Sequence, residues 1–136
     1  METLYRVEHK SDRLGPWVPR PEYDREAVVS YSDRKTGRSP SDGPGWDDDG
    51  INFQTGKGRR ICSKPYVTFV RSIDELKMWF APTHLRRLRQ AKFVVGEYRL
   101  PPRWIKHGTR QAAGLRYKGE HVRDIPLTNI LKGKLG

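Results

Sequence analysis

Cysteine is almost absent from the sequence, since Cys62 is the only one in 136 residues. A single cysteine excludes an intramolecular disulfide and any zinc site built from several thiolates. The histidines show no metal-ligand spacing such as HExxH. No apolar run approaches the length of a membrane span, and the first residues, METLYRVEHK, resemble a strand rather than a signal peptide. We therefore expect a soluble cytoplasmic protein, with no metal and no membrane partner.

Hydrophobic residues are also scarce. They make up 35% of the chain, whereas 32% of its residues are charged. Four Trp, six Tyr and four Phe nevertheless argue against a disordered chain, because disordered segments are usually poor in aromatic residues. We expect one domain over residues 1–136 with a small core. Residues 32–58 are rich in Gly, Pro, Ser and Asp, and they predict a long mobile loop within that domain.

Negative charge is scarce in the second part of the chain. Residues 1–56 carry 8 Lys/Arg and 11 Asp/Glu, a net charge of −3. Residues 57–136 carry 19 Lys/Arg and 5 Asp/Glu, a net charge of +14, which gives +11 for the whole chain. A protein of this kind is attracted to polyanions at low salt, whether or not that is its function. A nucleic acid, a nucleoprotein and an acidic protein all stay open as partners.

Periodic patterns predict both strands and helices. Alternating or β-branched segments predict strands at residues 4–8, 65–70, 92–100, 110–117 and 121–131, the last one frayed or helical from Asn129 onward. Segment 25–31 fits a strand or a helix. This order, without an internal repeat, is typical of an α+β fold rather than of a βαβ repeat. We expect a mixed or antiparallel sheet covered by two consecutive short helices.

The two predicted helices lie at residues 72–81 and 83–92. The first begins with a capping box, in which Ser72 and Glu75 can each satisfy a backbone N–H of the first turn. Pro82 ends this helix, and Thr83 can cap the next one.

The second helix has a wide apolar arc of Leu85, Leu88 and Ala91, which can pack on a sheet. The arginines of THLRRLRQ occupy the rest of its surface. They fit a solvated face or a contact with phosphates or an acidic protein. A helix-turn-helix is disfavoured, because Pro82 intervenes and the flanking segments are predicted strands.

Three loop motifs contain residues typical of binding sites. WDDDGINF (46–53) lacks the alternating oxygen ligands and the distal Glu of a calcium loop, so a turn is favoured. GKGRR (56–60) lacks the first half of a P-loop and is a basic turn. Trp17, Trp46 and Trp104 can stack on a base or anchor an interface, but Trp17 and Trp104 fit better as covers of the core.

Several motifs together resemble a family of small phage and prophage proteins. They are YRVEHK…GPW, WDDDGI, a Cys before SxxxLxxWF, LxxL…FxVxxY, and the GxxQ of residues 108–111. The matches span most of the chain, and the resemblance implies a phage origin rather than a particular chemistry. Phage accessory proteins of this size commonly redirect or block host machinery, including defence complexes. The basic turn before Cys62 and the basic second half depart from the family pattern and indicate a negatively charged partner.

A second, fainter resemblance is to the ADP-ribosyltransferase-like fold. Arg6 of YRVE, Thr68 of YVTF and either Gln111 or Glu120 could take the places of its Arg, Ser/Thr and Glu. This resemblance implies that Arg6 holds an NAD phosphate and Glu120 stabilises the ribose cation. The usual Ser-Thr-Ser motif is absent, and Gln111 would lack the charge, so a version of the fold without NAD stays open.

We therefore expect a non-enzymatic phage accessory protein without a cofactor. It would bind and inhibit or redirect a host nucleoprotein or defence complex through a basic surface. The alternatives are an NAD-dependent mono-ADP-ribosyltransferase, with Arg6, Thr68 and Glu120 as its catalytic residues, and a plain DNA- or RNA-binding protein. The residues expected to bind the partner are basic or aromatic: Lys57, Arg59, Arg60, Arg86, Arg87, Arg89, Trp104 and Trp46.

Overall fold

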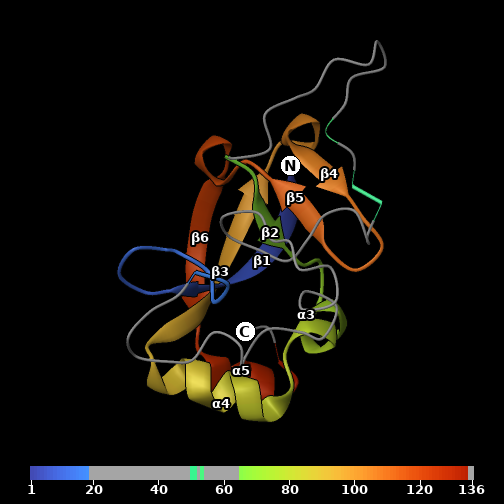
Figure 1. Cartoon of the computed structure of the whole chain (residues 1–136). Coiled ribbons are helices and arrows are strands. Elements are labelled where there is room, and N and C mark those ends of the chain that lie inside the picture. Colours follow the sequence, from blue (N-terminus) through green and yellow to red (C-terminus); the bar gives the residue numbers. More distant parts are fainter. Residues whose placement is uncertain (19–49, 52, 54–64, 135–136) are drawn as a thin grey trace.

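The computed structural model describes residues 1–18, 50–51, 53 and 65–134 (Figure 1). Within these residues the strands are β1 (Glu2–His9), β2 (Val67–Phe69), β3 (Phe93–Leu100), β4 (Ile105–His107), β5 (Ala112–Gly114) and β6 (Glu120–Ile125). The helices are α3 (Ile73–Trp79), α4 (Pro82–Gln90) and α5 (Leu127–Leu131), with two 3-10 turns, η2 (Pro102–Trp104) and η3 (Arg116–Lys118). The predicted α+β class is confirmed. Segment 25–31 and the predicted loop 32–58, except for residues 50, 51 and 53, lie outside the described residues.

Two three-stranded antiparallel sheets form the fold, with strand orders β1-β3-β6 and β2-β5-β4. In the larger sheet β1 pairs with β3 along eight residues, from Glu2 opposite Leu100 to His9 opposite Phe93. β6 pairs with the other side of β3, and a bulge leaves Val122 without an opposite residue. The two sheets meet where Tyr5 and Val70 exchange backbone hydrogen bonds of 2.8 and 2.7 Å.

The first helix has the predicted N-cap, whereas Glu75 binds the N–H of the residue before that cap and not one of the first turn. Ser72 is the N-cap of α3, and its hydroxyl accepts a hydrogen bond from the Glu75 N–H at 3.2 Å. The Glu75 carboxylate accepts from the Arg71 N–H at 2.9 Å. Leu76 and Trp79 are the buried residues of α3.

The cap of α4 corrects one prediction. The N-cap is Ala81, not Thr83, and Pro82 occupies the first turn. Proline tolerates this position because its missing N–H would have no helical partner there. The His84 ring accepts from the Ala81 N–H at 3.3 Å, so the third residue of the helix satisfies the N–H of the N-cap.

The end of the chain also differs from the prediction. The predicted strand 110–117 is reduced to β5 followed by η3, and β4 was not predicted. The predicted strand 121–131 ends at Ile125, and a helix follows after Pro126. Three-residue strands are too short for an alternating pattern, and the apolar run IPLTNIL fits a strand and a buried helix equally well.

The main core lies between the helices and one face of the larger sheet. Leu85 and Leu88 of α4 and Ile130 of α5 pack in one cluster with Phe93 and Val95 of β3. α4 and α5 lie side by side at one end of the molecule, at the bottom of the view, whereas β4 and β5 lie toward the opposite end (Figure 1). The eight residues of β3 connect the two ends, which separates them by about 25 Å.

Candidate functional site

The helix α4 divides into a buried and a cationic face. Leu85 and Leu88 are 1% and 0% exposed, because they pack into the main core. Arg86, Arg87 and Arg89 are exposed, and no acidic partner is recorded for them within the described part of the chain. The arginine face predicted from the sequence therefore exists and points away from the core.

Further cations lie on the elements that join α4. Lys92 follows the helix and has a left-handed backbone with φ of 67°, a conformation that costs energy for any residue except glycine. Its carbonyl accepts from the Lys10 N–H at 3.1 Å, which ties the turn to the end of β1. Lys132 and Lys134 follow α5 and are exposed. We name this group the cationic end: Arg86, Arg87, Arg89, Lys92, Lys132 and Lys134.

Acidic residues do not interrupt the cationic end in the sequence. Neither residues 80–96 nor residues 125–136 contain an Asp or a Glu. Arg86 and Arg89 are three residues apart on one helical face, where like charges repel each other by a few tenths of a kcal/mol. The cationic end therefore concentrates positive charge, and no acid within the described residues forms an ion pair with its arginines.

Of the other predicted binding residues, Trp104 is the one that the structure describes, and it is not part of the cationic end. Trp104 lies in η2, beyond the far end of β3. It is half-buried and packs against a satellite core cluster that contains Phe53 and Tyr66. Lys57, Arg59, Arg60 and Trp46 lie outside the described residues. Trp17 covers the core as predicted, with its ring centroid 5.3 Å from that of Phe80.

A second set of arginines surrounds a buried carboxylate. Glu8 is 0% exposed and lies 3.0 Å from Arg6 Nε through Oε1, and 3.0 Å from Arg13 Nη1 through Oε2. Arg116 Nη1 lies 3.6 Å from Oε1, and the Tyr98 hydroxyl donates to Oε2 at 2.5 Å. Burial and this hydrogen bond raise the pKa of Tyr98. We name these five residues the Glu8 cluster.

Asp124 extends the Glu8 cluster to the surface. Arg13 donates to both oxygens of Asp124, at 2.6 and 3.1 Å, and the His121 ring lies 2.8 Å from Oδ1. The hydrogen bonds from Arg13 lower the pKa of Asp124, and the bond to Asp124 raises the pKa of Arg13. Arg13 has a left-handed backbone with φ of 63°, and its carbonyl accepts from the guanidinium of Arg116.

The Glu8 cluster was not predicted. The alternation of LYRVE places Arg6 and Glu8 on the same strand face as Leu4, which is a weak signal that this face is buried. Asp124 is 111 residues from Arg13, so no local pattern connects them. Glu8, His121 and Asp124 lie close enough together to hold a cation, with ligand atoms within 4.8 Å of one another. Both carboxylates already bind Arg13, whose charge opposes a metal ion there.

The residues of the transferase resemblance are partly brought together. Arg6 Nη1 donates to the Thr68 carbonyl at 2.9 Å, and the Thr68 hydroxyl donates to Gln111 Oε1 at 2.9 Å. Glu120 is exposed at the start of β6 and is not recorded in these contacts. Arg6 is 3% exposed, and its guanidinium already binds Glu8 and the Thr68 carbonyl.

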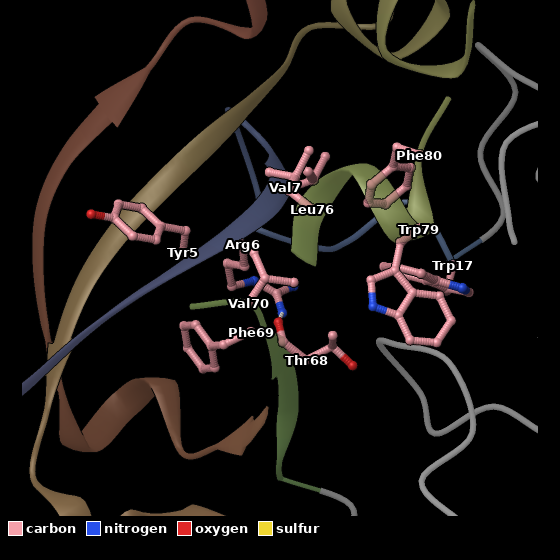
Figure 2. A pocket seen from close by; sticks show the side chains of 10 residues that line it. All are labelled: Tyr5, Arg6, Val7, Trp17, Thr68, Phe69, Val70, Leu76, Trp79 and Phe80. Carbon is pink, nitrogen blue, oxygen red and sulfur yellow. Dashed lines mark hydrogen bonds between the residues drawn. The ribbon is translucent and has the colours of Figure 1, made fainter. Parts of the chain in front are cut away.

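Little space adjoins Arg6 and Thr68. A small cavity lined by both residues and by aromatic side chains from Trp17, Trp79 and Phe80 has a volume of about 10 Å³ (Figure 2). This volume accommodates about one water molecule. Arg6 is therefore engaged in contacts within the fold, whereas its role toward NAD stays a prediction.

Fold and surface together define a small α+β protein with a buried arginine–carboxylate cluster and an exposed cationic end. The chain belongs to the bacteriophage T4 Y00F protein family, whose model matches residues 1–128. The predicted phage origin is therefore confirmed. No curated protein and no solved structure matches the chain. Among the helices of the described residues, none has the length and apolar character needed to cross a membrane.

Proposed function

We propose that this phage protein is a non-enzymatic accessory factor that docks on a host nucleoprotein or defence complex and inhibits or redirects it. The observation that supports this proposal is the cationic end, where α4, its C-terminal turn and the end of α5 present six cations. Opposite charges across an interface steer association and reject wrong partners more than they add affinity. A negatively charged face of a host complex fits this requirement.

The cationic end has the geometry of a docking surface. The arginines stand on a helix whose apolar side is anchored in the main core, so their backbone positions are fixed before binding. A guanidinium offers a planar set of donors that fits a carboxylate or a phosphate in a bidentate manner. A partner carboxylate or phosphate would also offset the repulsion between Arg86 and Arg89.

The experiment compares two variants that lose the same amount of charge, one inside and one outside the cationic end. The first carries Arg86→Gln, Arg87→Gln and Arg89→Gln. The control carries Lys77→Gln, Arg99→Gln and Arg123→Gln, all exposed side chains outside the cationic end. Each protein is immobilised and exposed to nuclease-treated extract of a host bacterium at about 0.15 M salt.

The wild-type protein and the control variant are expected to retain one host complex. The first variant is expected to bind it about tenfold more weakly, because three contacts of roughly 0.5 kcal/mol each are lost. Equal retention by the two variants, or no retained complex, would contradict the proposal. Capture that disappears on nuclease treatment would identify a plain nucleic-acid binder instead. In that case, each phosphate contact removed would flatten the salt slope by about 0.9 on duplex DNA.

A further inference from the structure

A second surface, remote from the cationic end, combines aromatic rings with cations. Tyr117 in η3 is 67% exposed, the highest exposure among the large hydrophobic side chains of the described residues. Lys118 Nζ lies 5.7 Å from the centroid of the Tyr117 ring and 5.2 Å from that of the Trp104 ring. The Arg103 guanidinium carbon lies 5.4 Å from the Trp104 centroid. Residues 98–119 contain no Asp or Glu. We name Arg103, Trp104, Tyr117 and Lys118 the aromatic platform.

The turns that carry the aromatic platform are held in place by an ion pair and by hydrogen bonds. The Arg116 side chain, next to Tyr117, is tied to Glu8 and to the Arg13 carbonyl. The Lys118 N–H donates to the Leu115 carbonyl at 3.0 Å, and the Leu115 N–H donates to the Trp104 carbonyl at 3.2 Å. η2 and η3 are therefore joined through their backbones. An exposed ring on such a turn loses little conformational freedom when a ligand binds to it.

We propose that the aromatic platform binds single-stranded nucleic acid, with a base stacked on Tyr117 and phosphates held by Lys118 and Arg103. Stacking on exposed rings combined with neighbouring cations is how proteins bind single strands without reading their sequence. A paired duplex keeps its bases stacked inside, so it cannot use the Tyr117 ring. This site goes beyond the proposed function, because it lies at the other end of β3 and shares no residue with the cationic end.

The test uses fluorescence anisotropy with an oligothymidylate of about twelve nucleotides. Two companion probes are an oligonucleotide of the same length with abasic sites and a duplex. The stacking variant is Tyr117→Ala, with Tyr117→Phe as the control that keeps the ring. The charge variant is Lys118→Gln. Because both side chains are exposed, circular dichroism is expected to show unchanged folding for all variants.

Wild-type protein is expected to bind oligothymidylate in preference to the abasic strand and the duplex. Tyr117→Ala is expected to weaken binding about tenfold with an unchanged salt slope, because it removes a stacking contact and no charge. Tyr117→Phe is expected to bind like the wild type. Lys118→Gln is expected to flatten the salt slope by about 0.7.

Three results would overturn the site. One is equal affinity of Tyr117→Ala and wild type, and another is equal affinity for the abasic and the normal strand. The third is that Tyr117→Ala abolishes capture of the host complex from nuclease-treated extract but leaves the affinity for oligothymidylate unchanged. This surface would then be a protein interface. The variant with glutamines at positions 86, 87 and 89 should keep its preference for the normal over the abasic strand. Failure of the docking proposal can therefore be distinguished from failure of this one.

Discussion

Arginine occurs in two contrasting regions of this molecule. In the Glu8 cluster, Arg6, Arg13 and Arg116 surround a fully buried carboxylate and connect β1, the turn after it and η3. In the cationic end, three arginines of α4 are exposed and form no ion pair with an acid of the described residues: Arg86, Arg87 and Arg89. The same side chain takes part in buried ion pairs in one region and is exposed to solvent in the other.

This contrast shows why net charge alone is a poor measure of a binding surface. The net charge of +11 counts every cation equally. The Glu8 cluster uses guanidinium groups to neutralise Glu8 and Asp124, and removal of Glu8 would take away the carboxylate that the buried Arg6 binds. Substitutions in the two regions should therefore have opposite consequences, with stability lost in one and binding lost in the other.

The largest expected effect is that of Glu8→Ala. This substitution leaves Arg6, Arg13 and Arg116 without their shared acceptor, and breaking a buried ion pair costs about 3–5 kcal/mol. Urea unfolding should show a loss of this size, or no folded protein. Glu120→Ala, at an exposed position of β6, is the matched control and should change stability by less than about 0.5 kcal/mol. Similar stabilities for the two variants would show that the Glu8 cluster does not hold the fold together.

A smaller loss is expected for Arg13→Ala. Arg13 binds both Glu8 and Asp124, but Glu8 keeps Arg6 and Tyr98 as partners in the variant. We expect a loss of about 2 kcal/mol in the free energy of unfolding. Arg86→Ala is the control with the same chemical change on the exposed helix face, and it should stay within about 0.5 kcal/mol of the wild type. The contrast between the two regions would not hold if both substitutions had the same effect.

The free energy of unfolding should depend on pH through Asp124, which binds Arg13 of the Glu8 cluster. The Arg13 hydrogen bonds lower the pKa of Asp124 below the ordinary value of an aspartate, so the folded state favours the ionised carboxylate. The stabilisation is present above the unfolded pKa and is lost as the pH falls through the folded pKa. The difference in unfolding free energy between wild type and Asp124→Asn should therefore be constant near neutral pH and shrink below about pH 4. A difference that stays constant down to strongly acidic pH would contradict this assignment.

The smallest effect on stability is expected at the cationic end. The triple variant with glutamine at positions 86, 87 and 89 should unfold within about 0.5 kcal/mol of the wild type, because surface substitutions rarely change stability by more. Relief of the repulsion between Arg86 and Arg89 could even produce a slight gain. A loss of more than about 2 kcal/mol in the free energy of unfolding would instead show that these arginines stabilise the fold.

Local sequence patterns were sufficient to predict part of this structure. The capping box at Ser72 and the apolar arc of Leu85 and Leu88 correctly predicted two helices, because these features depend on residues within a few positions of each other. The long strand at 92–100 was also correct within one residue. Pro126 separates β6 from α5, but the apolar run around it did not reveal which side was helical.

The candidate sites depend on contacts between residues that are far apart in the sequence, and local sequence patterns do not reveal such contacts. The arginine face of α4 was visible as a pattern, whereas its assembly with Lys132 and Lys134 required α5 to fold beside α4. Tyr117 was missed because it was placed in a predicted strand, and only η3 exposes its ring. Arg6 was considered as a ligand for NAD, but the fold pairs it with Glu8 and buries it.

Lysine labelling tests the central claim most directly, because it locates the docking surface without any substitution. The protein is acetylated alone and in the nuclease-treated complex with its host partner, and the modified lysines are measured by mass spectrometry. The cationic end is expected to be protected in the complex at Lys92, Lys132 and Lys134, while the exposed Lys77 of α3 and Lys118 of the aromatic platform react as in the free protein. Unchanged labelling of the first three lysines would contradict docking through the cationic end.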